Sequence, residues 1–204
     1  MYLPSHFAET DTACIHDLMR RNSFATIVTQ AGEAPFATHM PVLLHAERGP
    51  LGTLVSHMAR ANEQWRHFAD GREVLVIFHG PHAYVSPSWY EKRPAVPTWN
   101  YAAVHAYGVP RIIEDATSLR TMLRELVQHF EANREQPWGA ELTDEYLDKL
   151  SPGIVGLEIA ITRLEGKFKL SQNRSAADKA GVIVALAQSP DQTAREVAEL
   201  MKEK

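Results

Sequence analysis

Apolar and polar positions alternate along much of the chain before residue 114, as in strands with one buried face. Residues 24–29 and 35–44 form two such runs around Gly32, which predicts a hairpin. Gly80 and Pro81 predict a turn between two later strands. The other predicted strands are 51–56, 73–78, 82–86, 98–107, 111–113 and 154–164. Because short turns join most of them, we expect a β-barrel and not a parallel α/β sheet.

Helical periodicity is clearest over residues 117–130, where apolar side chains recur every three or four positions. Such a stripe is typical of an amphipathic helix packed on a sheet. Shorter helices are predicted at 11–21, 59–69 and 143–150. Together the patterns predict a mainly β protein with helices, of the α+β class.

The end of the chain differs in character, with alanine-rich helices predicted at 176–187 and 192–202. We therefore expect a barrel domain over 1–173 and a helical appendage over 174–204. Two helices joined by a short turn are typical of helix-turn-helix DNA-binding proteins. This segment, however, carries five basic and five acidic residues, whereas a DNA reader concentrates positive charge. DNA binding fits the pattern of helices but is not supported by the charge.

The composition is that of an ordinary folded protein, because 45% hydrophobic and 23% charged residues are close to the averages for globular domains. A formal charge of −4 gives no overall attraction to nucleic acid. No secretory signal is evident and no apolar run approaches the ~18 residues of a membrane span. We expect a cytoplasmic protein without a membrane partner.

The common catalytic signatures are absent: we find no dinucleotide or phosphate-binding glycine loop, no nucleophile elbow and no zinc-protease pair. The ten histidines lack metal-ligand spacing, so we expect no metal site. Cys14 falls on a predicted amphipathic helix, which favours a core role over that of a nucleophile.

A candidate anion pocket lies where the strand at 51–56 ends. Ser56, His57 and Arg60 stand there beside the start of a predicted helix, whose first N–H groups lack partners. A hydroxyl, an imidazole and a guanidinium beside such N–H groups could bind one phosphate. In the alternative, Ser56 only caps the helix and Arg60 is solvated. The residues by themselves favour neither interpretation over the other.

A second candidate segment interleaves polar and aromatic side chains at Trp99, Asn100 and Tyr101. A flat heteroaromatic ligand needs rings to stack on and polar groups at its edges. The alternative is a barrel lid whose aromatic residues close the core. Residues 167–173, which include Lys169, either add cations and amides to the same pocket or form a solvated linker.

Four segments carry a family resemblance: 57–65, 80–90, 96–101 and 163–173. In order and spacing they resemble the PaiB-type family, the FMN-binding negative transcriptional regulators. The resemblance extends from about residue 2 to residue 181. It implies an FMN-binding split β-barrel followed by a C-terminal helical tail, and a homodimer with FMN in a cleft between subunits that represses genes.

The resemblance also assigns residues to the cofactor. In the wider superfamily of split-barrel flavoproteins the third strand and the following turn hold the FMN phosphate, and Ser56, His57 and Arg60 occupy the matching place here. Thr38 and His39 on the second strand would face the flavin. They stand where the related oxidases carry a second phosphate-binding cation.

From the partner subunit, the resemblance adds Trp99 and Asn100. The complete set of expected FMN-binding residues is Thr38, His39, Ser56, His57, Arg60, Asn62, Trp99, Asn100, Tyr101 and Lys169.

Two functions fit these expectations. The first is an FMN-binding negative regulator that acts as a homodimer. The second is an enzyme of the same superfamily, either a flavin-dependent oxidoreductase or one that modifies a small molecule or haem. The sequence leaves enzymatic activity open, because hydride chemistry belongs to the cofactor and needs no dedicated acid or base.

Overall fold

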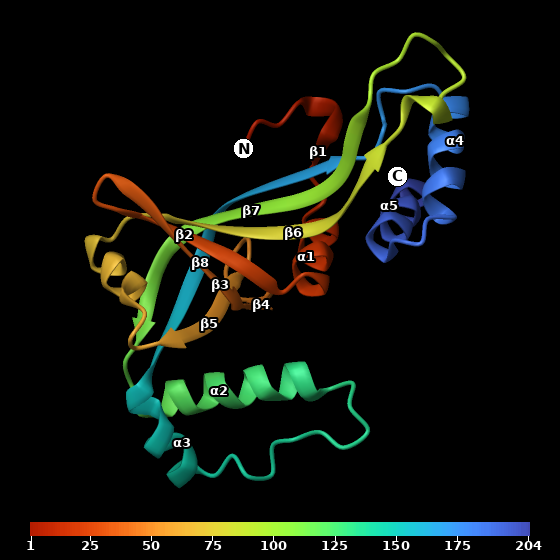
Figure 1. Cartoon of the computed structure of the whole chain (residues 1–204). Coiled ribbons are helices and arrows are strands. Elements are labelled where there is room, and N and C mark those ends of the chain that lie inside the picture. The colour runs from red at the N-terminus through yellow and green to blue at the C-terminus, as the bar shows by residue number, and fades with distance from the viewer. The chain divides into compact units, whose positions relative to one another are not determined.

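The computed structural model describes all 204 residues and contains one antiparallel sheet. Its strand order is β3-β2-β6-β7-β8-β5-β4, and the short strand β1 (Ala8–Glu9) pairs with β8 (Figure 1). The sheet with its helices confirms the α+β class. The chain forms two compact units, which are unit 1 (residues 1–21, 79–105 and 165–204) and unit 2 (residues 22–78 and 106–164).

Three long strands contribute residues to both units. They are β6 (Val74–Val85), β7 (Thr98–Ile113) and β8 (Ile154–Lys169).

Unit 2 is built on the predicted hairpin of β2 (Phe24–Ala31) and β3 (Ala34–Pro41). Gly32 in its turn has φ +60°, in the left-handed region that such turns require. The remaining elements of this unit are β4 (Leu43–His45), β5 (Thr53–Ala59), the 3₁₀ helices η2 (Glu63–Asp70) and η4 (Ser151–Gly153), α2 (Ala116–Glu131) and α3 (Asp144–Leu150).

The core of unit 2 lies between its strands, where Ile27, Leu54, Val76, Leu157 and Ile159 are almost fully buried. These side chains come from β2, β5, β6 and β8, so strands distant in sequence share one apolar layer. Burial of this apolar surface is the main stabilising term for such a layer.

Helix α2 covers β5 with the stripe that its periodicity predicts. Leu119, Met122 and Leu126 pack in one buried cluster with Val55. Asp115 caps the helix by accepting a hydrogen bond from the Ser118 N–H at 2.8 Å. The prediction of an amphipathic helix on the sheet is confirmed.

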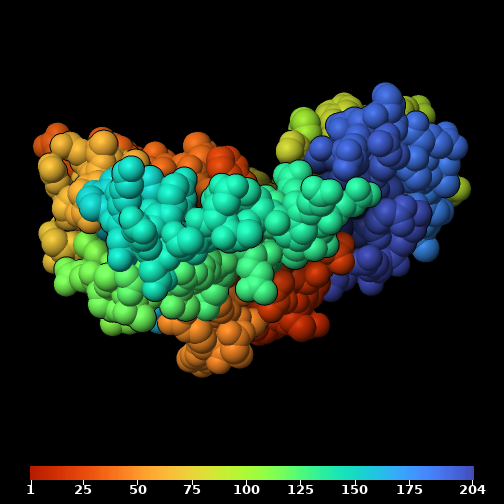
Figure 2. All heavy atoms as spheres, turned by 90° about the horizontal axis from the view of Figure 1, so that it is seen from below, coloured from red at the N-terminus to blue at the C-terminus, as the bar shows by residue number.

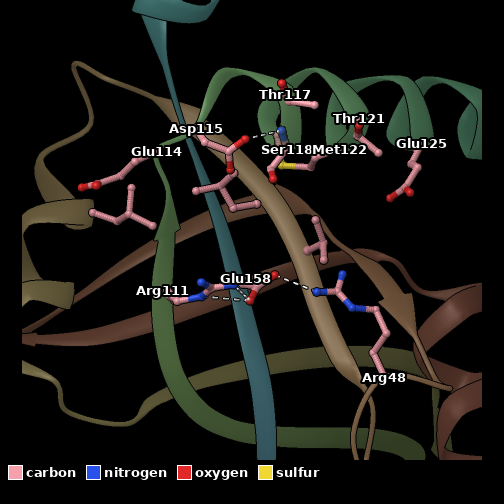
Figure 3. Close-up of a pocket in the computed structure, with 13 residues that line it drawn as sticks. Arg48, Arg111, Glu114, Asp115, Thr117, Ser118, Thr121, Met122, Glu125 and Glu158 are labelled. Carbon is pink, nitrogen blue, oxygen red and sulfur yellow. Dashed lines mark hydrogen bonds and ion pairs between the residues drawn. The ribbon is translucent and has the colours of Figure 1, made fainter.

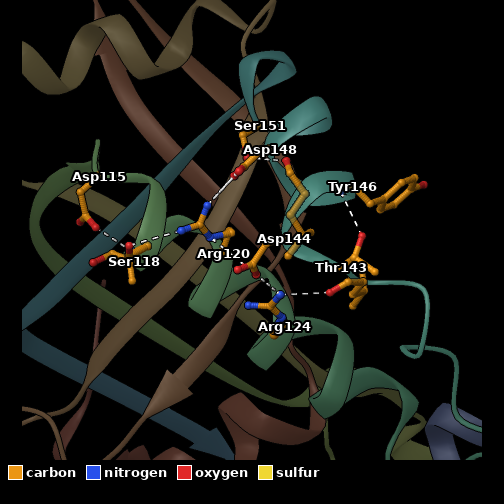
Figure 4. Close-up of polar contacts among 12 residues, drawn as sticks. Asp115, Ser118, Arg120, Arg124, Thr143, Asp144, Tyr146, Asp148 and Ser151 are labelled. Atoms are coloured by element: carbon orange, nitrogen blue, oxygen red, sulfur yellow. Dashed lines mark hydrogen bonds and ion pairs between the residues drawn. The ribbon is translucent and has the colours of Figure 1, made fainter.

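Ion pairs attach α3 to α2. Arg120 contacts Asp148 at 2.7 Å, and Arg124 contacts Asp144 (Figure 4). The space-filling view shows the side chains of α2 and α3 next to each other at the surface (Figure 2). Because these carboxylates are exposed to solvent, the pairs orient α3 more than they stabilise the unit.

Unit 1 contains β1 and the adjoining ends of the long strands. Its other elements are η1 (Ser5–Phe7), α1 (Thr12–Arg21), η3 (Pro87–Trp89), α4 (Ala176–Ala187) and α5 (Gln192–Glu203). Buried Asp178 of α4 accepts hydrogen bonds from the backbone N–H groups of Glu91 and Lys92 at 2.8 and 3.3 Å. This carboxylate therefore ties the loop after η3 to the C-terminal helices.

Two predicted strand breaks are wrong. Gly80 and Pro81 lie inside the continuous strand β6, and Gly108 lies inside β7. A Cβ at Gly80 would approach the Ala102 carbonyl oxygen to 2.9 Å, and one at Gly108 would approach the Ala160 carbonyl oxygen to 2.3 Å. These glycines allow close approach of backbones and do not form turns.

Two other boundaries also differ. The run at 35–44 divides at Val42, whose N–H donates to the Ser23 carbonyl at 2.8 Å, so that β4 can pair with β5. The helix expected at 59–69 is the 3₁₀ helix η2, which begins only at Glu63 because Ala59 still belongs to β5.

The compact units do not follow the expected boundary at residue 173, because α4 and α5 cluster with residues 79–105 in unit 1. Val197 and Met201 of α5 are fully buried, which accounts for this association. No helix has the length and apolar character needed to cross a bilayer.

We predict that Gly108→Ala lowers the free energy of unfolding by about 1–3 kcal/mol, because its methyl group would collide with the Ala160 backbone. Urea unfolding measures the change. The control is Gly139→Ala, where a Cβ would meet no atom within 4 Å. Equal losses in the two variants would contradict the close approach of β7 and β8.

Candidate functional site

A polar cluster in unit 2 joins β3 to the turn after β5. Asn62 donates from Nδ2 to the Thr38 hydroxyl at 2.9 Å, and its Oδ1 caps η2 by accepting from the Gln64 N–H at 3.0 Å. His39 Nδ1 lies 2.8 Å from the Thr26 hydroxyl, and its exposed ring stacks on Phe24. The structure thus brings Thr38 and Asn62 together.

Gln64 holds this cluster in place, a role that the sequence did not single out. Its side chain has no exposed surface, and Nε2 lies 3.1 Å from the Ile27 carbonyl, the Thr29 hydroxyl and the Phe36 carbonyl. Both strands of the hairpin are therefore fixed to η2. The only signal in the sequence was its place in the segment 57–65.

Ser56 and His57 point to opposite faces of β5, since they are neighbours on a strand. Ser56 is 1% exposed and donates to the Pro41 carbonyl at 2.5 Å. Its hydroxyl is thus inside the core and does not face a phosphate. His57 is half-buried on the other face, and its Nδ1 is buried without a hydrogen-bond partner.

Arg60 lies on the turn between β5 and η2. The expected helix N-terminus is not at this residue, because η2 begins at Glu63. Nε of Arg60 donates to the Pro152 carbonyl at 3.0 Å, and Nη2 of the same side chain donates to the Ile154 carbonyl at 2.9 Å. A guanidinium has five N–H donors, so the exposed group is held in position and keeps donors for an anion.

Among the predicted residues of unit 1, one is also exposed and another is buried in the core. Trp99 is 52% exposed and makes an edge contact with Tyr84 at a centroid distance of 6.1 Å. Asn100, in contrast, has no exposed surface, and its Nδ2 donates to the Ser171 hydroxyl at 2.9 Å. Within this fold Asn100 supports the packing of Met201, whose sulfur lies 3.3 Å from the same nitrogen, and does not face a ligand.

Lys169 lies on the same face of β8 as Lys167. Its ammonium donates to the Thr98 hydroxyl at 2.5 Å and to the Trp99 carbonyl. Burial lowers the pKa of Lys169, and the nearby charges of Lys167 and Arg174 lower it further. Residues 167–173 therefore do not form a solvated linker.

Unit 1 contains two cavities beside these residues. One of about 420 Å³ borders Trp99, Trp89 and Tyr84, and the other, of about 430 Å³, borders Tyr101 and Lys167.

A third pocket, in unit 2, contains none of the predicted residues. It measures about 310 Å³ and lies between the start of α2 and the strands β7 and β8 (Figure 3). At its base Glu158 accepts from Arg48 at 2.8 Å and from Arg111 at 2.5 Å. Burial raises the pKa of Glu158, but these hydrogen bonds outweigh burial and hold the pKa below its usual value. No group of three His, Cys, Asp or Glu side chains is arranged to hold a metal ion.

Comparison with known proteins identifies the family. The model of the family described as "Putative FMN-binding domain" matches residues 1–163. The chain belongs to this FMN-binding family.

Relatives match over the whole chain. The protease synthase and sporulation protein PAI 2 of Bacillus subtilis is 38% identical over 206 residues, which cover 100% of this chain and 98% of that protein. An uncharacterized protein of Emericella nidulans is 34% identical, covering 100% of this chain and 97% of its own length.

Solved structures share the fold. The FAD and heme binding protein of Mycobacterium smegmatis superposes with a TM-score of 0.61 at 19% identity, covering 85% of this chain and 78% of its own. The split-barrel flavoprotein fold expected from the sequence is confirmed.

We predict that His57 makes folding sensitive to mild acid. Burial lowers the pKa of its imidazole, so between that lowered value and the unfolded pKa of about 6.5 the unfolded chain binds more protons. The free energy of unfolding should therefore fall as the pH drops through this window.

The His57→Gln variant should lose this part of the pH dependence, as measured by urea unfolding between pH 8 and 5. The control is His129→Gln, at an exposed position on α2. If His57→Gln retains the full slope, another group causes the dependence.

Proposed function

We propose that the protein is an FMN-binding negative regulator of transcription that works as a cytoplasmic homodimer. The observation that carries the proposal is the 38% identity over the full length of this chain to PAI 2, which is named a protease synthase and sporulation protein. A match confined to the barrel would support FMN binding alone, whereas this one includes the C-terminal helices.

The polar groups of unit 2 suit the phosphate and the polar ring edge of FMN. Arg60 is an exposed guanidinium fixed by two carbonyls, and we assign it to the phosphate. His57 has a buried ring nitrogen without a partner, which a ligand would satisfy. Thr38, His39 and Asn62 add hydroxyl, imidazole and amide groups. When bound, FMN supplies hydride or single-electron chemistry.

Trp99, Tyr101 and Lys169 of unit 1 also stay in the proposal as the resemblance implies them, with Trp99 contributed by the partner subunit. Exposed Trp99 offers a stacking surface. Ser56 and Asn100 are not part of the proposed site, because their side chains form hydrogen bonds inside the core.

The charges of the C-terminal helices favour regulation through another molecule over direct DNA contact. Arg195 donates to the carbonyls of Ser189 and Pro190, and Lys202 pairs with Glu199 at 2.6 Å. Direct readers hold phosphates with clusters of Lys and Arg that are free to make such contacts. We therefore propose that the FMN-loaded dimer acts on a partner of the transcription machinery.

A second candidate is a flavin-dependent oxidoreductase. The cavity of about 430 Å³ beside Tyr101 favours it, since a substrate could enter there. Reduction of bound flavin by NADH or NADPH under anaerobic conditions distinguishes this enzyme from a regulator.

We predict that Arg60→Ala weakens FMN binding about tenfold or more, because one charge-assisted hydrogen bond contributes about 1.5–3 kcal/mol. Titration of the flavin absorbance measures the dissociation constant. The matched control is Arg66→Ala, which removes another arginine lying over Trp65 and should leave the constant unchanged. Equal affinities of Arg60→Ala and wild type would remove Arg60 from the site.

We further predict that cells lacking the protein have raised levels of specific transcripts. Wild type should restore repression, and Arg60→Ala should restore it only weakly. Sedimentation should give twice the 22.9 kDa chain mass. An unchanged transcript profile would exclude the regulatory role, and a strong salt-sensitive gel shift by the protein alone would show direct DNA binding instead of action through a partner.

A further inference from the structure

The cavity beside Tyr101 contains a buried cation. Lys167 lies in its wall and is 8% exposed, with Tyr2 and Tyr101 on the same wall. The other polar lining residues are His79, His82 and His105. Met1, Gly80, Ala102 and Ala103 line the rest, and the small size of the last three leaves the cavity its volume of about 430 Å³.

Lys167 has little to compensate its charge. Nζ donates to the Tyr2 carbonyl at 3.0 Å and lies 5.3 and 5.4 Å from the ring centroids of Tyr2 and Tyr101. Nearby carboxylates have other cations: Glu165 pairs with the terminal amine, and Glu9 pairs with Lys204 at 2.5 Å. A buried ammonium is normally paired with an anion, because desolvation of a single charge is costly.

The surroundings increase the positive potential. Lys169, two residues further along β8, is close enough that the charge of Lys167 lowers its pKa. No carboxylate lines the cavity, whereas three imidazoles provide further donors. The two tyrosine rings provide flat apolar contact surface beside the cation.

We propose that this cavity binds a small aromatic compound that carries a phosphate or carboxylate. The anion pairs with Lys167 Nζ, and the aromatic ring lies against Tyr101 and Tyr2. The proposed function assigns the FMN phosphate to Arg60, so the ligand of this cavity is a separate effector or substrate. If the cavity holds the FMN phosphate instead, the assignment to Arg60 is wrong. The experiment distinguishes these sources.

Phenyl phosphate is the probe, titrated calorimetrically into the full chain. Wild type should bind it, and Lys167→Met should weaken binding at least tenfold. The control Lys202→Met removes an exposed lysine of α5 outside the cavity and should match wild type. Phenol, which lacks the anion, should show no difference between wild type and Lys167→Met. Absence of phenyl phosphate binding, or equal binding by Lys167→Met, overturns the proposal.

FMN and riboflavin form the second arm. If Lys167→Met weakens the binding of FMN but not of riboflavin, the cavity holds the FMN phosphate. If the variant binds both as wild type does, the anion belongs to another ligand. Either result is compatible with an anion site at Lys167. If wild type binds phenyl phosphate through Lys167 but never binds FMN, the proposed function fails and this inference stands.

Thermal unfolding of wild type and Lys167→Met shows whether a loss of phenyl phosphate binding results from a folding defect of the variant. Lys167→Met should melt at or above the wild-type temperature, because it removes a buried charge that lacks a counter-ion. Phenyl phosphate should raise the melting temperature of wild type and not that of the variant. A lower melting temperature of the unliganded variant would give Lys167 a structural role through Tyr2 and overturn the proposal.

Discussion

The alternation of side chains along β-strands is the constraint on which the candidate site depends. Adjacent residues face opposite sides of the sheet, so a motif written as consecutive letters is divided between core and surface. On β5, Ser56 enters the core between the strands, while half-buried His57 lies on the opposite face of the strand. On β7, Asn100 is buried between the more accessible Trp99 and Tyr101.

Buried polar groups determine which parts of the structure are fixed and which can receive a ligand. Gln64, Asn100 and Asp178 are buried, and each makes hydrogen bonds that join segments distant in sequence. Such groups stabilise one arrangement because leaving them without partners costs free energy. His57 makes no such link: its Nδ1 is buried without a partner, as is Oε1 of Gln64. Lys167 donates only to the Tyr2 carbonyl and has no carboxylate partner.

The proposed function needs no acid or base from the chain itself. In that proposal the chain supplies positioned donors and aromatic surfaces, and a bound flavin supplies the reactivity. The neutral C-terminal helices are integrated into unit 1 by buried Val197 and Met201 and are not a free appendage.

The sequence by itself determined the hairpin at Gly32, the covering helix over 117–130, the antiparallel fold class and the FMN-binding family, because these depend on local periodicity and on motifs in register. Only the tertiary structure decided that Gly80 and Gly108 lie inside strands, since their role is to admit a neighbouring backbone that no local pattern specifies. It also decided the partners of Ser56 and Asn100, because hydrogen bonds between distant segments exist only after the chain has folded.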